Sequence, residues 1–368
     1  MHAYFAEIEK KLELMRSQNR LREVRENSGK DFSSNDYLCL AQSQFLKNKL
    51  CEGIEKFGAG STSSRLVRGH RDVFAIAEEK FSNWINSAAS LFVANGYAAN
   101  TGLFSSMGPD TEFYTDRLNH SSIIDGIRLS GGEKIYYKHL NMNDLEMKLK
   151  KKSGKKKVIV SETVFSMDGD VAPLDDLVTL KKKYDCLLVL DEAHAIGIFG
   201  NSGNGVAAEY YRDVDYRVFT MGKSMGMEGA FVSSTKQAIA YLVNTMRTFV
   251  FSTAPMPAIA WCVPDLIEKV IAMKEERSRI LSHAESFRMQ LQQAGYDTMN
   301  SRSHIIPVLC KDETQALKMA STLSTQGYDI RAIRPPTVNQ SRLRISIHAC
   351  HSRQDIDSLA QVFATGGF

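Results

Sequence analysis

The sequence predicts an α/β fold, with a large domain built on a mostly parallel central sheet covered by helices and a smaller C-terminal α/β domain. The chain has 368 residues, of which 43% are hydrophobic, so it is longer than one typical domain and can bury a sizeable core. From about residue 88 to 233, short apolar runs alternate with helical patterns. Two of the runs, KVIVS (157–161) and CLLVL (186–190), show no alternation of apolar and polar residues, which is typical of strands buried on both faces of a parallel sheet.

The N-terminal segment is predicted to be an amphipathic helix over residues 4–25. Its apolar side chains recur at helical spacing with Lys and Glu between them, and they include Tyr4, Phe5, Ile8, Leu12 and Met15. This apolar stripe has to cover something, either on its own chain or on a partner chain. We expect residues 1–45 to form this helix and an arm, which contains the turn-rich segment DFSSNDYLCL.

The large domain is expected over residues 46–255 and the small domain over residues 256–368. The large domain begins with a loop rich in Gly and Ser, followed by seven expected strands: ASLFV (89–93), TEFYT (111–115), EKIYY (133–137), KVIVS (157–161), CLLVL (186–190), RVFT (217–220) and GAFVS (229–233). The small domain is expected to contain two helices and three strands. The helices are a long one (265–295) and a second one (314–326), and the strands are HIIPVL (304–309), YDIRAI (328–333) and RLRISI (342–347).

The overall charge and hydropathy exclude several classes of protein. The formal net charge is only +4, so nothing demands a nucleic acid as partner. No apolar stretch reaches the roughly 20 residues that a membrane span needs, and the charged N-terminus lacks the apolar core of a secretory signal. We therefore expect a cytoplasmic protein. The one strong charge run, KLKKKSGKKK (148–157), is either a solvated connection or a landing site for an acidic carrier.

Asp191 follows CLLVL directly, at the end of an expected buried strand. Open α/β sheets bind their ligands at such strand ends. A buried carboxylate costs free energy unless it meets a cation, and a protonated pyridine nitrogen is such a cation. Asp191 would keep that ring protonated and able to accept electrons from a substrate carbanion. The alternative is that Asp191 caps the start of a helix.

Lys223 lies in the tight, small-residue turn of RVFTMGKSMG (217–226). A buried lysine loses proton affinity and becomes a nucleophilic amine, and the Gly and Ser neighbours let a flat cofactor approach the backbone. Thr220, three residues upstream, is a candidate donor to a phosphate. The GKS triplet is not a phosphate-binding Walker motif, because that motif requires Gly at the position of Arg217.

Other polar residues also follow expected strands. Gly96 and Tyr97 lie in a loop before a helix expected from about residue 98, and helix N-termini bind phosphate; the alternative is an ordinary turn. His120 is either structural or stacks on an aromatic ring. His194 and Ser166 are candidates for the area of the cofactor's ring hydroxyl. Because the sequence has no HExxH motif and no Cys/His cluster, no metal site is expected.

Taken together, these segments resemble the α-oxoamine synthase family of fold-type I transferases that depend on pyridoxal 5'-phosphate (PLP), with the aminotransferase class I/II fold. The resemblance runs nearly end to end. The matching stretches are FSSNDYLCLA (32–41), NGYAAN (95–100), DRLNHSSIIDGIRLS (116–130), ETVFSMDGDVAPL (162–174), DEAHAIGIFGNSGNG (191–205), TMGKSMG (220–226), FSTAPMP (251–257) and AIRPPTV with RLRISIHACH (332–351).

The resemblance implies a cofactor site and a substrate site. Lys223 would bind PLP covalently through its amine as a Schiff base, with Asp191 paired to the ring nitrogen and His120 stacked on the ring. Further cofactor contacts would come from Ser166, His194, Gly96, Tyr97 and Thr220. On the substrate side, the resemblance implies a bidentate grip on the amino-acid carboxylate by Arg344, and contacts from Arg22 and Thr337. Arg22 matches a family arginine near the acyl donor; the alternative is a solvated helix residue.

The resemblance also implies a reaction and a partner. ETVFSMDGDVAPL and AIRPPTV favour the branch that condenses L-alanine with a pimeloyl thioester, from CoA or an acyl carrier protein, in biotin biosynthesis. The alternatives are a glycine C-acetyltransferase or another acyl-CoA:amino acid C-acyltransferase, and a silent subunit, against which the presence of Lys223 argues. Family members are homodimers with the active site at the subunit interface, which suits the N-terminal helix.

The chain departs from the family pattern at two places beside the expected chemical set. Cys39 stands where Gly is common, and Met227-Glu228 replace a small or His-containing pair. These departures leave the expected cofactor unchanged and bear on the acyl specificity.

Overall fold

The computed structural model describes residues 2–24, 26–151 and 153–366, which form two compact units. The large unit comprises residues 35–166 and 171–279, and the small unit comprises residues 1–34, 167–170 and 280–368. These units are divided differently from the expected domains, because residues 1–34 group with the C-terminal part and residues 256–279 group with the large unit. Arg25 of the expected N-terminal helix, Lys152 of the basic run, and the expected domain ends Met1, Gly367 and Phe368 lie outside the described residues.

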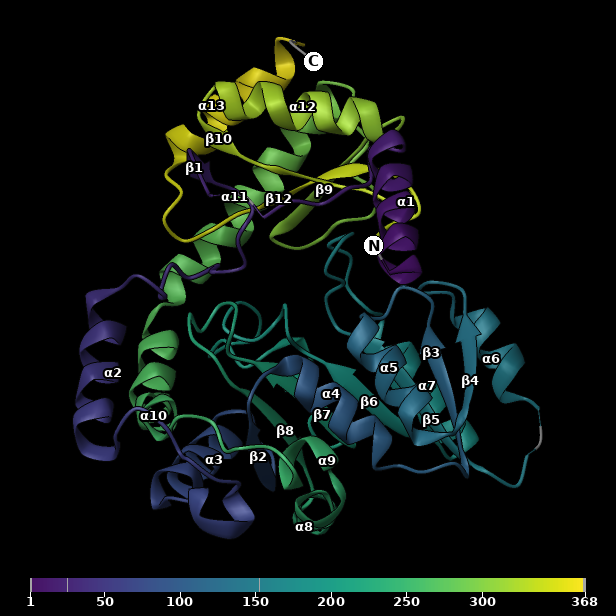
Figure 1. Cartoon of the computed structure of the whole chain (residues 1–368), viewed down its shortest axis with the longest axis vertical. Helices are drawn as coiled ribbons and strands as arrows, with labels where there is room; N and C mark the ends of the chain where they lie inside the picture. The colour runs from purple at the N-terminus through teal and green to yellow at the C-terminus, as the bar shows by residue number, and fades with distance from the viewer. Residues whose placement is uncertain (1, 25, 152, 367–368) are drawn as a thin grey trace. The chain divides into compact units, whose positions relative to one another are not determined.

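The large unit is built on a seven-stranded sheet with the strand order β2-β8-β7-β6-β5-β3-β4 (Figure 1). Every described pair of neighbours is parallel except those that involve β8, which is antiparallel to both β2 and β7. Each expected run forms a strand within one residue of its expected ends. The strands are β2 (Ala89–Val93), β3 (Thr111–Asp116), β4 (Glu133–Tyr137), β5 (Lys156–Glu162), β6 (Leu187–Asp191), β7 (Tyr216–Thr220) and β8 (Ala230–Ser234).

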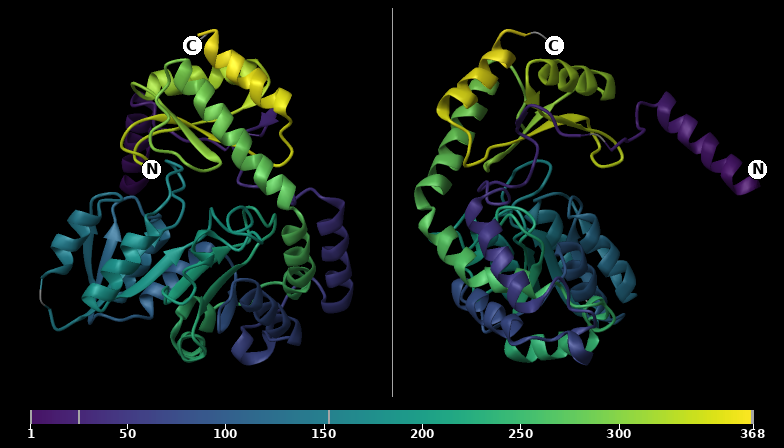
Figure 2. Two further views of the ribbon diagram at one scale, coloured as in Figure 1. Left: turned by 180° about the vertical axis from the view of Figure 1, so that it is seen from behind. Right: turned by 60° about the vertical axis from the view of Figure 1, so that its left-hand side comes forward.

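Both faces of this sheet are buried under helices (Figure 2). Val158 and Val160 of β5 point into one core, and Ile159 points into the other. This two-sided burial explains why the strand sequences do not alternate, and it confirms the predicted fold class. The first core is covered by α4 (Gly96–Ser105), α5 (Ser121–Ser130), α8 (Lys236–Thr245) and α9 (Arg247–Val250), and the second by α6 (Met142–Leu149) and α7 (Leu174–Tyr184).

The single helix expected over 265–295 is wrong, because two helices occupy this stretch. Helix α10 (Pro257–Ala272) ends at Met273, and α11 (Lys274–Gln293) follows it from the large into the small unit. The Arg277 guanidinium donates to the carbonyl oxygens of Val270 and Ile271 at the end of α10, which satisfies groups that every helix end leaves open. In the large unit α10 packs against α2 (Gln44–Phe57) and α3 (Asp72–Trp84), and shorter turns form at Arg65–Gly69 and Val206–Ala208.

The small unit contains two small sheets. They are the antiparallel sheet β11-β12-β9 and the parallel pair β1-β10, and α12 packs against strands of both. The expected strand 328–333 is interrupted at Ile330, so that it contributes to both sheets. The elements are β1 (Lys30–Asp31), β9 (Ile305–Leu309), α12 (Glu313–Thr325), β10 (Tyr328–Asp329), β11 (Arg331–Ile333), β12 (Arg342–Ser346) and α13 (Arg353–Ala364).

The N-terminal helix α1 (Ala3–Ser17) is shorter than the expected 4–25. The chain leaves the helix at Asn19, whose φ of +53° is a left-handed conformation that Asn adopts more readily than most residues. None of the residues of α1 is buried, and Tyr4 and Phe5 are about 60% exposed. The apolar stripe is therefore only partly covered by its own chain, with Ile8 and Leu12 half-buried. Among the described residues, no helix has both the length and the apolar character needed to cross a bilayer.

Candidate active site

The candidate site of the large unit lies where β5, β6 and β7 end. These strands run parallel in adjacent positions, and their last residues are Glu162, Asp191 and Thr220. Glu162 and Asp191 are direct partners in the strand register. Polar side chains at the carboxyl ends of neighbouring parallel strands meet at one edge of the sheet, which is the place where open α/β sheets bind ligands.

Asp191 is a buried carboxylate held by hydrogen bonds. Its Oδ2 accepts from Asn100 Nδ2 at 2.7 Å, and its Oδ1 accepts from the backbone N–H of Ala193 at 2.9 Å. No described residue forms an ion pair with it. In the described chain no helix begins directly after Asp191, because turns follow it, so the helix-cap alternative does not apply. A buried carboxylate with this environment calls for a cationic partner.

Asn100 connects Asp191 to His120, and the sequence reasoning missed it. Besides the bond to Asp191, its side-chain amide donates to Ser122 Oγ at 3.0 Å, and that hydroxyl lies 2.7 Å from His120 Nδ1. Asn100 stands four residues after Gly96 in α4. Residues four apart share one face of a helix, so this spacing was the signal that could have revealed it.

Glu162 is a second residue that the sequence reasoning missed. It is buried, and its Oε1 accepts the backbone N–H of His120 at 2.6 Å. Burial raises the pKa of Glu162 to about 8, and the neighbouring charge of Asp191 adds to this shift. Burial thus favours the protonated form of Glu162, which limits the negative charge beside Asp191. The sequence signal was the acidic residue at the end of KVIVS, one strand away from Asp191.

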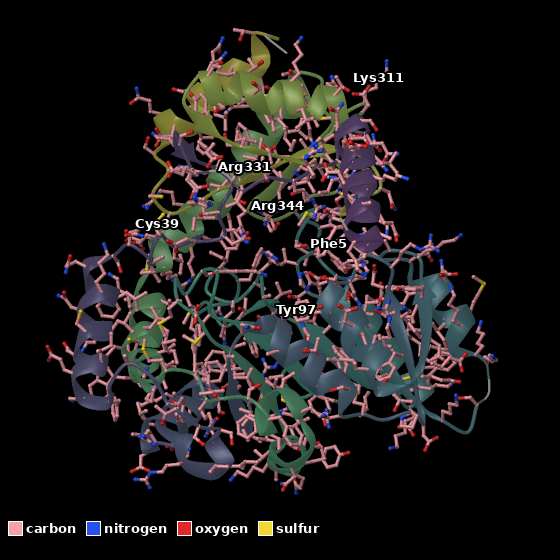
Figure 3. All side chains as sticks on the ribbon, viewed as in Figure 1. Phe5, Cys39, Tyr97, Lys311, Arg331 and Arg344 are labelled. Carbon is pink, nitrogen blue, oxygen red and sulfur yellow. The ribbon has the colours of Figure 1, made fainter. Side chains whose placement is uncertain are left out.

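His120 caps the N-terminus of α5 and remains exposed. The partial burial of the side chain lowers the pKa of His120, and the charge of Asp191 partly opposes this effect. The edge of the Tyr97 ring faces it, with the ring centroids 6.4 Å apart. Tyr97 lies in the first turn of α4 (Figure 3), and its hydroxyl donates to the Asp125 carboxylate. An uncharged, exposed imidazole can stack on an aromatic ligand.

Lys223 lies in the loop after β7, with its Nζ 2.8 Å from His194 Nε2. His194 is buried, and its other ring nitrogen lies 2.7 Å from the hydroxyl of Tyr37. On the other side of this loop, a Cβ added to Gly96 would lie only 3.3 Å from the Thr220 Cβ. The glycine thus lets the start of α4 approach the end of β7 closely. Ser166 lies half-buried in the turn after β5.

These residues fit PLP by the chemistry of their side chains. Asp191 offers a carboxylate for a pyridinium nitrogen, and Lys223 offers a primary amine for an aldehyde carbon. The N-terminus of α4, which begins at Gly96, offers N–H groups for a phosphate. Gly96 has no Cβ to stand between this helix start and the strand end at Thr220. The ring nitrogen, the aldehyde and the phosphate thus each have a candidate partner in the large unit.

The expected substrate residues all lie in the small unit. Arg344 is buried on β12, and its Nη1 donates to Ser346 Oγ at 2.9 Å. Arg22 lies beyond the end of α1, so it is not a helix residue, and it is exposed. Its Nη2 donates to Thr337 Oγ1 at 2.5 Å. The structure thus brings Arg22 and Thr337 together.

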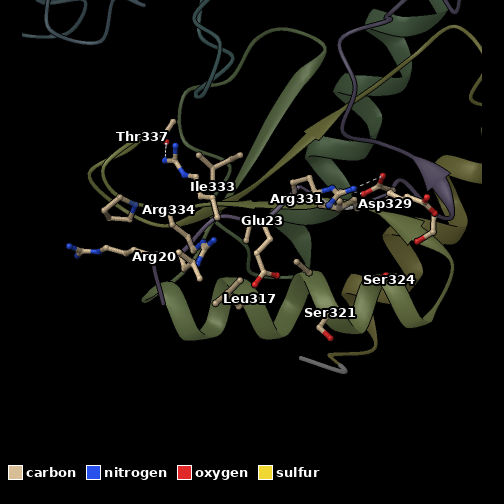
Figure 4. A pocket seen from close by; sticks show the side chains of 18 of the residues that line it. Arg20, Glu23, Leu317, Ser321, Ser324, Asp329, Arg331, Ile333, Arg334 and Thr337 are labelled. Atoms are coloured by element: carbon tan, nitrogen blue, oxygen red, sulfur yellow. Dashed lines mark hydrogen bonds and ion pairs between the residues drawn. The ribbon is translucent and has the colours of Figure 1, made fainter. Parts of the chain in front are cut away.

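Arg22 and Thr337 line a cavity of about 580 Å³ within the small unit (Figure 4). Its walls are formed by helix α12, by the segment around β11, and by residues 20–23, 26 and 28. Three further arginines line it; one of them, Arg331, forms an ion pair with Asp329 at 2.8 Å. The cavity lining is about equally polar and apolar, and it carries charges of both signs.

Comparison with known proteins identifies the family. The model of the family described as aminotransferase class I and II matches residues 29–363. This chain belongs to that family. It is 39% identical over 333 residues to an 8-amino-7-oxononanoate synthase of Lysinibacillus sphaericus, covering 89% of this chain and 85% of the relative. A relative of the same name from Geobacter sulfurreducens is 38% identical over 343 residues, covering 91% of this chain and 88% of the relative.

Solved structures of the family have the same fold. A serine palmitoyltransferase from S. paucimobilis with bound PLP has a TM-score of 0.90 at 26% identity, covering 99% of this chain and 98% of that one. An 8-amino-7-oxononanoate synthase from Francisella tularensis has a TM-score of 0.82 at 26% identity, covering 92% and 98%. The family member described here is therefore an α-oxoamine synthase, an acyltransferase whose cofactor is PLP. The expected family, cofactor and enzyme class are confirmed.

Proposed function

We propose that this enzyme condenses L-alanine with a pimeloyl thioester and releases CO2 and the thiol, giving 8-amino-7-oxononanoate for biotin biosynthesis. The observation that carries the proposal is the 39% identity over 333 residues to an 8-amino-7-oxononanoate synthase. In this chain, the strand ends also bring polar residues to one edge of the sheet. The segments FSMDGDVAPL and PPTV support the same substrates. The roles given to individual residues below belong to this proposal.

The residues of the large unit are proposed to hold and move protons. When bound, PLP supplies a ring that accepts electrons from the α-carbon of the amino acid. Asp191, fixed by Asn100, keeps the ring nitrogen protonated, and His120 covers the ring. Lys223 takes the proton from the α-carbon of alanine and later returns it. Between these two steps the α-carbon bonds to the thioester carbonyl, the thiolate leaves, and the carboxyl group departs as CO2.

The enzyme is proposed to act as a cytoplasmic homodimer. The uncovered apolar side chains of α1, among them Tyr4, Phe5, Leu14 and Met15, offer a face for a second copy of the chain.

The basic run 148–157 gives no support for docking an acidic carrier beside this chain's own cofactor site. Its last two residues, Lys156 and Lys157, open β5, whose far end is Glu162, and the five residue steps from Lys157 to Glu162 span about 17 Å. Either form of the thioester therefore remains compatible with the site.

We expect fast condensation of L-alanine with pimeloyl-CoA and much slower condensation of glycine with acetyl-CoA. One methyl group on the amino acid is worth only about 1–3 kcal/mol, so the acyl chain should discriminate more strongly than the amino acid. The measurement is initial-rate release of free CoA for all four pairings of the two amino acids with the two thioesters, with the amino ketone identified by mass.

The four pairings separate the two effects, because each substrate is changed while the other is kept. Faster reaction of glycine with acetyl-CoA would assign the enzyme as a glycine C-acetyltransferase instead. CoA release in the absence of any amino acid is measured as the background and subtracted, since it reports simple hydrolysis of the thioester.

Replacing Arg344 with alanine is expected to raise the KM for L-alanine much more than the KM for the thioester. A bidentate pair between guanidinium and carboxylate in a desolvated site is worth on the order of 2–5 kcal/mol when one partner is truncated. The measurement is steady-state kinetics with each substrate varied in turn. Arg353→Ala is the control, because Arg353 is an exposed arginine paired with Asp357 on its own helix. Equal weakening of both substrates in Arg344→Ala would indicate a structural role.

A further inference from the structure

A buried hydrogen-bonded chain reaches Lys223 from the segment NDYLCL, to which the proposed reaction assigns no role. The Tyr37 hydroxyl donates to Asn35 Oδ1 at 2.9 Å and lies 2.7 Å from His194 Nδ1. His194 Nε2 lies in turn 2.8 Å from Lys223 Nζ. The ring of Tyr37 is fully buried and His194 is 4% exposed. Water therefore has little access to the central bond of the chain.

The donors and acceptors along this chain determine which ring nitrogen of His194 carries the proton. A tyrosine hydroxyl has one proton, and Tyr37 gives it to Asn35 Oδ1. Toward His194 the Tyr37 oxygen can then only accept, so Nδ1 must carry a hydrogen. A lysine ammonium has donors and no acceptor. The direction of the bond to Lys223 then follows from the Tyr37 side: in a neutral imidazole whose hydrogen is on Nδ1, Nε2 has a lone pair and accepts from Lys223, which can donate as an amine or as an ammonium.

We infer that Tyr37, anchored by Asn35, holds His194 as the Nδ1–H tautomer, so that Nε2 faces Lys223 as a hydrogen-bond acceptor. Tyr37 is thus a positioning residue that acts on Lys223 through His194. Its value for turnover rests on the proposed function. When Lys223 takes the α-proton of the amino acid it becomes an ammonium, and the Nε2 lone pair stabilises that ammonium by accepting one of its N–H groups.

The tautomer is tested in the protein without cofactor or substrate, by nitrogen NMR with 15N-labelled histidine. A protonated ring nitrogen and a bare one differ clearly in chemical shift, and a His194→Gln variant identifies the signals of His194 among the nine histidines of the chain. Wild type is expected to show hydrogen on Nδ1. Tyr37→Phe keeps the ring and removes the acceptor, so the hydrogen is expected to move to Nε2, because a buried N–H without an acceptor is costly.

Variants at Asn35 distinguish control of the tautomer from simple packing. Asn35→Ala leaves the Tyr37 ring in place but frees its hydroxyl to donate to His194 Nδ1, so the hydrogen is again expected on Nε2. Asn35→Asp retains an acceptor for the Tyr37 hydroxyl and is expected to restore the wild-type tautomer. The control is Tyr210→Phe, which removes a hydroxyl bonded to Asp175 on the rim of α7 and is expected to leave the signals of His194 unchanged.

The same variants have a kinetic consequence in the loaded enzyme. Loss of the acceptor at Nε2 is expected to lower kcat about tenfold in Tyr37→Phe and Asn35→Ala, the size expected for one hydrogen bond to a charged group. The KM for L-alanine is expected to stay within about twofold, because the carboxylate grip is untouched.

The inference is overturned if wild type carries its hydrogen on Nε2, or if the tautomer is the same in wild type, Tyr37→Phe and Asn35→Ala. The NMR result does not depend on the substrates. If the tautomer moves as expected while L-alanine and the pimeloyl thioester fail to react, the proposed function is wrong and the role of Tyr37 in positioning His194 stands.

Discussion

Replacing Lys223 with alanine is expected to abolish turnover while leaving the fold intact. The amine of Lys223 is the group proposed to bind the cofactor covalently and to take the α-proton, so its loss removes both roles at once. The side chain lies in a loop after β7 and is not part of the two apolar cores. The unfolding temperature of the variant without cofactor should therefore stay close to that of wild type without cofactor.

Borohydride reduction provides the direct measurement. Reduction of the wild-type enzyme as purified is expected to fix the cofactor on Lys223, as shown by peptide mass after digestion, and to bleach its visible absorbance. The matched control is Lys236→Ala, which removes an exposed lysine at the start of α8 and should keep full activity and labelling. Label on any other lysine of the wild-type chain would contradict the assignment.

Replacing Asp191 with asparagine is expected to retain bound PLP and to lower kcat at least about a hundredfold, which corresponds to roughly 2.7 kcal/mol in the barrier. The neutral amide no longer keeps the ring nitrogen protonated, so the ring stabilises the carbanion poorly. The side chain keeps its size, and the amide oxygen of the substituted side chain can still accept from the Ala193 N–H. The loss is therefore attributed to the charge of Asp191.

The comparison needs both the cofactor content and the rate. Bound PLP is quantified after release from the protein, and kcat is measured with saturating L-alanine and thioester. Asp176→Asn is the control, because Asp176 is an exposed aspartate on α7. Near-normal kcat in Asp191→Asn with a full complement of PLP would show that Asp191 serves only to hold the turn at Ala193.

The strands and the two principal site residues followed from local patterns. An apolar run such as CLLVL records burial on both faces directly in its composition, so its position could be predicted within one residue. Lys223 and Asp191 stand out because charged residues at the ends of such runs are costly unless they serve a partner. The family resemblance supported the same two residues.

Partners that are distant in sequence could not be read from it. Asn100 meets Asp191 across 91 residues, and Tyr37 meets His194 across 157 residues. Such contacts arise from the order in which strands join the sheet, which no local pattern records. The same holds for Glu162, whose raised pKa results from burial beside Asp191 on the neighbouring strand.

The sequence by itself predicted the fold class, because hydrophobic runs are local consequences of burial. The resemblance to a known family implied the cofactor and the residues that are proposed to hold it. The tertiary structure alone decided how these residues are held. It also showed that Cys39, at a position where the family commonly has Gly, has a φ of +54°, a left-handed conformation that glycine adopts without steric cost. Backbone angles and proton positions depend on neighbours that only folding brings together, and for that reason the tautomer of His194 became a question only once Tyr37 and Asn35 were seen beside it.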